Sequence, residues 1–319
     1  MVAGKPREGS SSPPTLRVIS VVEFLTVRER PQSSAEIADG LGLSRSTVGA
    51  ILAALDEQGW VVRLPDRTYR LGPGLIAIGE RARPMLPHPD VVHDELDGLA
   101  RRVGCAVGLS TVHGDQLIVV ALAARGGRVP AGFASGTRLP LEPPGGASII
   151  AFADEAEQDA WLARSKPDDA PRFRRVLEVI RQTGVGVWGA SAADIETVDV
   201  IADVVSFLSA HPASAQLRDR LLSRLSSLAG NAYEPAQLSL DDELPVSVIT
   251  TPVFGAAGRA QWELQVGPFK SAVSREERKR IIDELLASAA RLARPEPDRA
   301  AGGHRVTRAL NVPARGAPD

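Results

Sequence analysis

The sequence predicts an α+β protein with two domains. Its 319 residues exceed what one small domain needs, and 44% hydrophobic against 24% charged residues is an ordinary globular composition. Apolar residues at helical spacing dominate residues 15–80, whereas pairs of apolar runs around Gly-containing turns follow from about 90 to 294. Three prolines in RARPMLPHPD (81–90) break any helix there, so this segment marks the joint between the two domains.

Three short helices are expected before Gly59. The first spans about residues 15–27. The second begins with a capping box, in which the side chains of Ser33 and Glu36 bond each other's backbone N–H groups. Ser44 follows a tight Gly-Leu-Gly-Leu connection and is a good N-cap for the third helix, which Gly59 ends.

Two short strands, WVVRLPDRTYRL at 60–71, follow the third helix. Helix, helix, tight turn, capped helix and β-hairpin in this order predict a winged helix-turn-helix, whose third helix enters the major groove of DNA. Hydroxyl and guanidinium groups at the start of that helix and on the hairpin can bond phosphates and base edges. The predicted DNA-binding residues are Ser34, Ser44, Arg45, Ser46, Thr47, Arg63, Arg67 and Arg70.

A protein-interaction or dimerisation module is the alternative interpretation of this segment. Residues 16–80 contain 7 arginines and no lysine against 8 acidic residues, a net charge of −1, which is poor for non-specific phosphate binding. The capped Ser-Arg-Ser-Thr start of the third helix and the arginine-bearing hairpin nevertheless occur together in the expected order. This combination favours DNA binding.

The second region predicts an antiparallel sheet with helices outside it. A helix from about residue 94 precedes a hairpin at 105–123, and a second hairpin occupies 245–266. A closing helix starts with a Ser-x-x-Glu capping box at Ser274. Strands that pair through hairpins indicate an α+β domain. Two amphipathic helix patterns at about 190–243 predict a helical insertion.

Composition and spacing give no support for catalysis or for metal and cofactor binding. The single cysteine, Cys105, excludes an internal disulfide and a multi-cysteine metal site, and is expected to be a buried thiol. The five histidines lack metal-site spacing, and Gly145 and Gly146 lack the Lys-Ser/Thr of a phosphate loop. No catalytic residue, metal or cofactor is therefore expected. Without a signal-peptide core or a membrane-length apolar run, the protein is expected in the cytoplasm.

Residues 33–79, SSAEIADGLGLSRSTVGAILAALDEQGWVVRLPDRTYRLGPGLIAIG, resemble the N-terminal domain of the IclR family of bacterial transcriptional regulators. GTRLPL (136–141) and ITTPVFGAAGR…LQVGP (249–268) are similar, more weakly, to parts of the family's second domain. The resemblance implies a winged helix-turn-helix followed by a GAF/profilin-like α+β domain that binds a small effector. It also implies a homodimer or homotetramer on a roughly palindromic operator in double-stranded DNA.

The sequence departs from the family pattern at two sites. Gly49 and Ala50 stand where the recognition helix usually has His and Arg. At the effector site, apolar residues stand where the family has serines, an acid and a small or thiol residue. They predict an apolar or aromatic effector, or a site filled by its own side chains. The effector-binding residues that the resemblance implies are Leu139, Gly145, Gly146, Ala147, Trp188, Val248, Leu264 and Val266.

The sequence therefore predicts a DNA-binding transcriptional regulator, a repressor whose operator binding responds to a small effector. A winged-helix interaction module and a constitutive DNA binder without an effector stay open as alternatives. The expected organisation is a disordered tail at 1–14, the winged helix-turn-helix domain at 15–80, a linker at 81–93, the effector-binding and oligomerisation domain at 94–294 with its helical insertion at about 190–243, and a disordered tail at 295–319.

Overall fold

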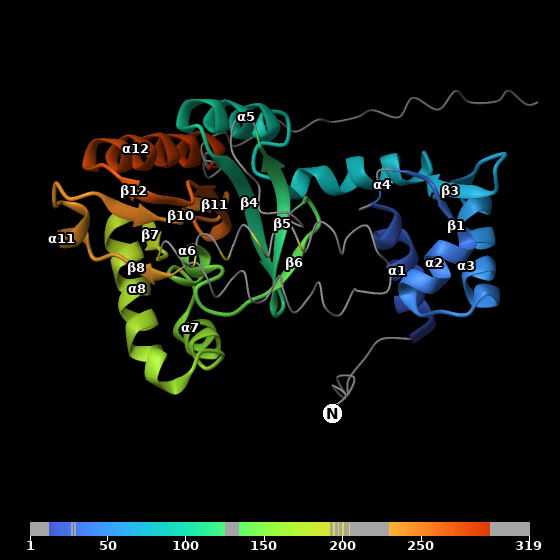
Figure 1. Ribbon diagram of the computed structural model, residues 1–319, viewed down its shortest axis with the longest axis horizontal. Helices are drawn as coiled ribbons and strands as arrows, with labels where there is room; N and C mark the ends of the chain where they lie inside the picture. The colour runs from blue at the N-terminus through green and yellow to red at the C-terminus, as the bar shows by residue number, and fades with distance from the viewer. Residues whose placement is uncertain are drawn as a thin grey trace, which may run out of the picture.

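The computed structural model describes residues 13–26, 28, 30–124, 134–191, 194, 197, 200, 204 and 230–293. It consists of a small N-terminal domain and a larger C-terminal domain, with helix α4 running between them (Figure 1). Helices and strands occur in both domains, which confirms the predicted α+β class. Among the described residues, no helix has the length and apolar composition needed to cross a membrane.

The N-terminal domain packs three helices against a three-stranded antiparallel sheet of order β1-β3-β2. Ser33 and Ser44 cap α2 and α3 as predicted, and Glu36 completes the capping box of α2. Gly42 ends α2 at φ 62°, a left-handed conformation that glycine adopts without strain, and so permits the tight turn into α3. The elements are α1 (Pro13–Thr26), β1 (Gln32–Ser33), α2 (Ser34–Leu41), α3 (Arg45–Glu57), β2 (Val61–Arg63), β3 (Thr68–Leu71) and α4 (Gly74–Ala82).

One apolar core holds the N-terminal domain together. Val21 on α1, Ile37 on α2 and Leu52 on α3 are fully buried and pack in the same cluster. Pro13 and Pro14 belong to the first turn of α1 and not to the predicted tail. The rest of that tail, and the tail predicted at 295–319, lie outside the described residues.

The C-terminal domain is built on a seven-stranded antiparallel sheet of order β6-β5-β4-β11-β10-β7-β8. Both predicted hairpins form, as β4–β5 and β10–β11. The elements are η1 (Arg83–Met85), α5 (Val92–Val103), β4 (Ala106–His113), β5 (Gln116–Ala123), β6 (Arg138–Pro140), α6 (Ala147–Ile150), α7 (Glu155–Leu162), η2 (Pro167–Asp169), α8 (Ala170–Thr183), β7 (Gly186–Gly189), β8 (Asn231–Ala232), α11 (Pro235–Leu238), β9 (Leu244–Val246), β10 (Val248–Phe254), β11 (Ala260–Gly267), β12 (Lys270–Val273) and α12 (Arg275–Leu292).

Helices cover both faces of this sheet (Figure 1). On one face, α5 and α12 bury Leu96, Leu99 and Ile281 against strand residues such as Leu264. We call this side the α5/α12 face. On the other, the α6/α8 face, α6, α7 and α8 pack around Trp161 and Trp188. Because side chains alternate along each strand, the two faces have separate cores.

A network around Glu95 joins α5 to α12. Its Oε1 accepts hydrogen bonds from Arg291 Nη2 (2.7 Å), Arg102 Nη2 (2.9 Å) and Ser288 Oγ (2.6 Å). Burial alone would raise the pKa of Glu95, but the hydrogen bonds from Arg291, Ser288 and Arg102 outweigh it and lower this pKa to about 2. The two helices are therefore fixed to each other as well as to the sheet.

The capping box predicted for the closing helix forms only in part. Ser274 Oγ caps α12 by accepting from the Glu277 N–H, but the Glu277 carboxylate pairs with Lys270 Nζ at 2.7 Å, so only half of the predicted capping box forms. The predicted helical insertion at 190–243 lies mostly outside the described residues. Its described C-terminal part contains strand β8 and helix α11.

Candidate functional site

The start of α3 presents a cluster of hydroxyl groups to solvent. Ser44 Oγ accepts from the Thr47 N–H at 3.1 Å, and it lies 2.8 Å from Thr47 Oγ1 and 2.9 Å from Ser46 Oγ. Arg45 and Ser46 are exposed beside it. The unpaired N–H groups and positive dipole end of α3 point the same way, so this surface suits an anion such as a DNA phosphate.

The wing is the β2–β3 hairpin, and its three arginines are exposed. Its turn is shaped by Asp66, which accepts from Thr68 Oγ1 (2.6 Å) and Thr68 N–H (3.0 Å); these bonds lower the pKa of Asp66. Arg63 lies opposite Tyr69 and Arg70 opposite Val62 in the strand register. Arg63 and Arg70 therefore point to opposite faces of the hairpin, and the predicted wing residues do not form one continuous patch.

Ser34 differs from the other predicted DNA-binding residues in its position and its exposure to solvent. It is the first residue of α2 and is half-buried, whereas Ser33 before it is the N-cap. The remaining predicted residues lie at the exposed start of α3 or on the wing. The contact of all eight residues with DNA stays a prediction.

The exposed side of α3 has small residues at Gly49 and Ala50. A Cβ added to Gly49 would meet no atom within 4 Å. Gly49→Ala is therefore expected to raise the free energy of unfolding of the N-terminal domain by roughly 0.5–1 kcal/mol, since alanine loses less backbone entropy in a helix. Chemical denaturation followed by circular dichroism measures this change. Gly59→Ala is the matched control: its added Cβ is also free, but φ 67° makes it destabilising. A Gly49→Ala variant less stable than the parent chain would contradict the prediction.

The eight predicted effector-binding residues do not lie together. Leu264 and Val266 are fully buried on the α5/α12 face. Leu139, Ala147 and Trp188 are buried on the α6/α8 face, and Val248 packs against the same cluster. Gly145 and Gly146 form the turn that leads into α6 on that side. The prediction that Leu264 and Val266 share one site with the other six is wrong.

The strand register explains this correction. Thr250 on β10 lies opposite Gln265 on β11, and its hydroxyl bonds Ser148 Oγ of α6, so Thr250 and Gln265 face α6. Their neighbours along β11 must then point the other way, because side chains alternate. Glu263 and Gln265 on β11 are thus on the α6/α8 face. The six predicted residues that remain on this face stay predictions as an effector site.

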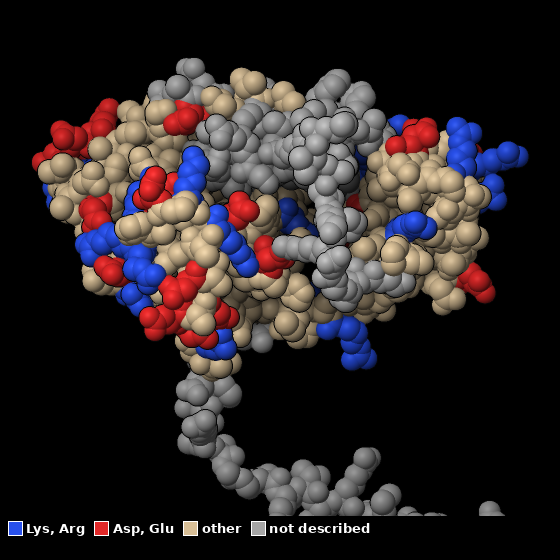
Figure 2. All heavy atoms as spheres, turned by 90° about the horizontal axis from the view of Figure 1, so that it is seen from below, with Lys and Arg blue, Asp and Glu red and all other residues tan. Residues whose placement is uncertain are grey.

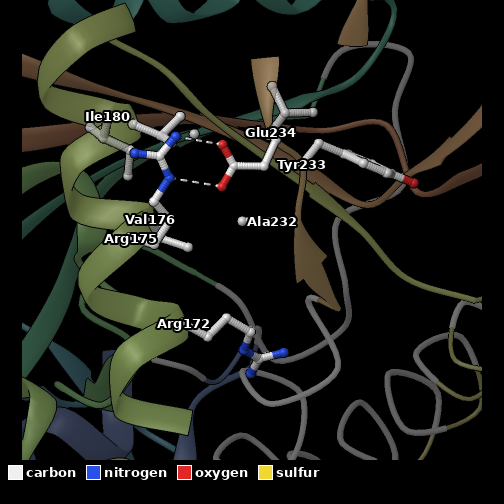
Figure 3. Close-up of a pocket in the computed structure, with 10 residues that line it drawn as sticks. Arg172, Arg175, Val176, Ile180, Ala232, Tyr233 and Glu234 are labelled. Carbon is white, nitrogen blue, oxygen red and sulfur yellow. Dashed lines mark hydrogen bonds and ion pairs between the residues drawn. The ribbon is translucent and has the colours of Figure 1, made fainter. Parts of the chain in front are cut away.

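A small cavity of about 100 Å³ lies between α8, β7 and the segment after β8. Arg175 and Glu234, two of its lining residues, face each other with Nε–Oε1 and Nη2–Oε2 hydrogen bonds of 3.1 and 3.0 Å, while Tyr233 points away (Figure 3). Arg172 bonds the Asn231 side chain nearby. Apolar residues including Val176 and Ile180 line its interior. None of the eight predicted effector residues lines this cavity.

Sequence reasoning missed a buried polar cluster beneath α6. The Glu263 side chain is 2% exposed, and its Oε2 accepts from the Ser148 N–H at 2.9 Å. Ser148 Oγ and Thr250 Oγ1 lie 2.8 Å apart. Burial raises the pKa of Glu263 to about 7, although the bonds from Ser148 and Gly146 favour its charged form. An acidic residue between the apolar residues Trp262 and Leu264 was the available sequence clue.

Cys105 is buried as expected, and burial raises the pKa of its thiol. Among the described residues, no group of His, Cys, Asp and Glu could hold a metal ion. Basic and acidic side chains are interspersed over the C-terminal domain in the view of Figure 2, so that face shows no broad patch of one sign.

Comparisons with known proteins agree with these features. The model of the IclR helix-turn-helix domain matches residues 15–65. The HTH-type transcriptional regulator Rv1719 of Mycobacterium tuberculosis is 32% identical over 178 residues, which are 53% of this chain and 68% of the relative. The structure of an IclR transcriptional regulator from Alicyclobacillus acidocaldarius has a TM-score of 0.59 at 20% identity, covering 89% of this chain and 98% of that one. An IclR homolog from Microbacterium hydrocarbonoxydans, solved with 4-hydroxybenzoate, has a TM-score of 0.54 at 16% identity, covering 88% and 98%.

A winged helix-turn-helix followed by this α+β domain defines a DNA-binding transcriptional regulator. The extent of the match to the Mycobacterium relative settles the family. The chain belongs to the IclR family of transcriptional regulators, as residues 33–79 led us to expect. It is a regulator and not an enzyme.

Proposed function

We propose that this protein represses transcription by binding a roughly palindromic operator, with α3 in the major groove and the wing on the flanking backbone. The observation that supports this best is the start of α3, where Arg45 and Ser46 are exposed around the Ser44 cap. Arg45 is the residue there that can form a bidentate contact with guanine. Since the chromosome is its target, we place the protein in the cytoplasm.

Binding to the intergenic DNA upstream of its own gene tests this proposal. Fluorescence anisotropy with that duplex and with a scrambled duplex, at several salt concentrations, separates specific from non-specific binding. We expect specific binding that weakens steeply with salt, because phosphate contacts release counterions. Equal, weak binding to both duplexes would favour the interaction module. A reporter gene behind the same operator distinguishes repression from activation.

Arg45→Ala is expected to weaken operator binding by about 1–3 kcal/mol, or roughly 5- to 150-fold, and to reduce discrimination against the scrambled duplex. The reason is the loss of a base-edge or phosphate contact from the start of α3. Arg81→Ala is the matched control, an exposed arginine on α4 outside the predicted interface. Unchanged affinity and specificity in Arg45→Ala would remove this residue from the interface.

We infer that a small apolar or aromatic effector acts on the α6/α8 face of the C-terminal domain. Leu139, Trp188 and Val248 supply apolar surface there, and the cavity beside α8 has an apolar interior. The Microbacterium homolog, solved with the aromatic acid 4-hydroxybenzoate, supports an aromatic ligand. Thermal-shift and operator-binding assays with 4-hydroxybenzoate and its neutral analogue 4-hydroxybenzyl alcohol test this inference. A ligand that binds must also change operator affinity to qualify as an effector.

A constitutive DNA binder without an effector is the second candidate, and the buried network of Glu263, Ser148 and Thr250 favours it. The Ser148 N–H bonds Glu263, the Ser148 and Thr250 hydroxyls bond each other, and the Gln265 side chain covers Gly108 on the same face. Such packing is what a site filled by its own side chains requires. Operator affinity unchanged by every apolar and aromatic compound in a broad screen would support this candidate.

Two copies of the chain are needed to read a two-fold symmetric operator. Helix α4 has no buried residue, and Ile76 and Ile78 on it are exposed, 67% and 45% respectively. Met85, just after α4, is 77% exposed. Exposed apolar side chains of this size are typical of a surface that another chain covers, so they support self-association near α4. Light scattering coupled to gel filtration measures whether the assembly is a dimer or a tetramer.

A further inference from the structure

Glu263 is a carboxyl group sealed between the sheet and the turn before α6. Its partners in the strand register are Ser110 on β4 and Pro252 on β10, both neutral. Above it lie the Gly146 and Ser148 backbone amides, which favour its charged form. A buried carboxylate normally needs a cation or a full set of hydrogen bonds to offset its desolvation.

Within the part of the chain that the structure describes, no cationic side chain faces Glu263. The charged side chains of the elements around it are His113 on β4, Glu142 in the turn before α6 and Arg259 before β11, and all three are exposed. Arg259 lies 3.8 Å from Glu157 of α7, a partner of its own. Among the described residues, no charged side chain contributes to the pKa of Glu263, which burial raises to about 7. The ionised form is therefore poorly compensated in this packing.

Ser110 indicates independently that the polar groups of this cluster are not all hydrogen-bonded. It is fully buried directly across from Glu263, and its Oγ has no hydrogen-bond partner among the described residues. Ser110 Oγ therefore makes no hydrogen bond to the Glu263 carboxyl in this packing, and it does not stabilise a charge there. The closed packing thus suits the protonated form of Glu263.

A short segment connects this cluster to the DNA-binding domain. Ser148 bonds Glu263, and ten residues earlier Arg138 on β6 pairs with Glu23 on α1, with Nη2 and Oε1 2.8 Å apart. Between them, Leu139 and Leu141 are buried in the core of the α6/α8 face. Residues 138–148 are therefore held at one end by α1 of the winged domain and at the other by Glu263.

We propose that Glu263 is a positioning residue whose protonation state, acting through residues 138–148, sets how firmly the C-terminal domain holds α1 of the DNA-binding domain. This inference rests on the proposed function. With Glu263 neutral, the segment stays packed and the Arg138–Glu23 ion pair holds α1. With Glu263 ionised, the turn before α6 moves away to admit water to the charge, and the hold on α1 weakens. The DNA-binding domain must then lose more conformational freedom when it binds the operator.

Operator binding as a function of pH tests the proposal. We expect the full-length protein to bind its operator more weakly at about pH 8 than at about pH 6, by about two- to fivefold beyond the change seen in Glu263→Gln, which cannot ionise. Ionic strength is held constant because phosphate contacts are salt-sensitive. Superimposable pH profiles for the parent chain and Glu263→Gln would overturn the proposal.

Charge exchange tests the route through Arg138. Arg138→Glu places a like charge against Glu23 and is expected to flatten the pH profile, while the double variant Glu23→Arg/Arg138→Glu restores it. The control is Arg174→Glu, another exposed ion-paired arginine that lies on α8. A double variant with the same flattened profile as Arg138→Glu would overturn the role of the ion pair.

Two further measurements test the proposal if Glu263→Gln does not fold or if the protein binds no operator. If Glu263→Gln does not fold, Ser148→Ala is expected to move the pH midpoint upward, because the Ser148 hydroxyl favours the ionised carboxyl. An unshifted or lowered midpoint would overturn the proposal. If no operator is bound at any pH, the proposed function fails, but hydrogen exchange in residues 138–148 still decides this inference. Protection that does not fall with pH relative to Glu263→Gln, after correction for intrinsic exchange, would overturn it.

Discussion

Arg278→Met is expected to lower the free energy of unfolding of the C-terminal domain by about 3 kcal/mol. Arg278 is only 1% exposed, although it bears a charge. Its Nη1 donates to the carbonyl oxygens of Val273 (2.6 Å) and Asp242 (2.8 Å), and its Nη2 donates to that of Leu240 (2.8 Å). The guanidinium therefore fixes the loop between α11 and β9 onto α12. Methionine fills a similar volume but leaves these buried carbonyl groups without their donors.

Arg275→Met is the matched control for this prediction. Arg275 lies one turn earlier on α12 and also contacts the loop, through a 2.7 Å pair with the Asp241 carboxylate, but both side chains are largely exposed. We expect this variant to lose less than about 1 kcal/mol, because exposed ion pairs contribute little. Urea denaturation of both variants measures the difference. Equal losses would show that burial of the guanidinium is not what makes Arg278 important.

Local patterns made the helix starts and hairpins predictable. Ser33 and Ser44 cap helices because their side chains bond the N–H three residues on, which depends only on neighbouring sequence. The β4–β5 and β10–β11 hairpins likewise follow from apolar runs around short turns. These features place the exposed start of α3 correctly, and with it the candidate DNA-binding surface.

The composition of the α6/α8 face could not be derived in the same way. Matching Leu264 and Val266 to family positions put them in the site, but strand register decides which face a side chain takes, and a shift of one residue reverses it. The place of β11 in the sheet also depends on its pairing with β4, whose residues 106–113 lie far from it in sequence. Only the folded sheet shows that Glu263 and Gln265 occupy this face.

Long-range partners also explain why Arg278 and Arg138 were not singled out. Arg278 lies in a helix rich in charged residues, and its burial depends on the loop 238–242, some 40 residues earlier. Arg138 finds its partner Glu23 across 115 residues and in the other domain. A single charged residue in a sequence has no local feature that indicates such a partner.

The stability of the Glu263→Gln variant is expected to rise relative to the parent chain as pH increases. The pKa of Glu263 is about 7 in the folded protein against 4.5 in the unfolded chain, so folding makes this carboxyl hold its proton more tightly. The parent chain is therefore destabilised as pH rises from about 4.5 to about 7, by about 3 kcal/mol in total. Glutamine cannot ionise and shows no such loss.

The difference between the two unfolding curves isolates Glu263, because every other titrating group is common to both proteins. Measurements between about pH 5 and about pH 8 also avoid the acid range, where Glu36 and Glu95, whose pKa values are lowered to about 2, lose their contribution as pH falls. Glu142→Gln, an exposed neighbour in the turn before α6, is the matched control and should follow the parent chain. A free-energy difference between Glu263→Gln and the parent chain that stays constant with pH would mean that Glu263 titrates alike in the folded and unfolded states. The charge would then already be compensated in the folded protein, and the turn before α6 would have no reason to move.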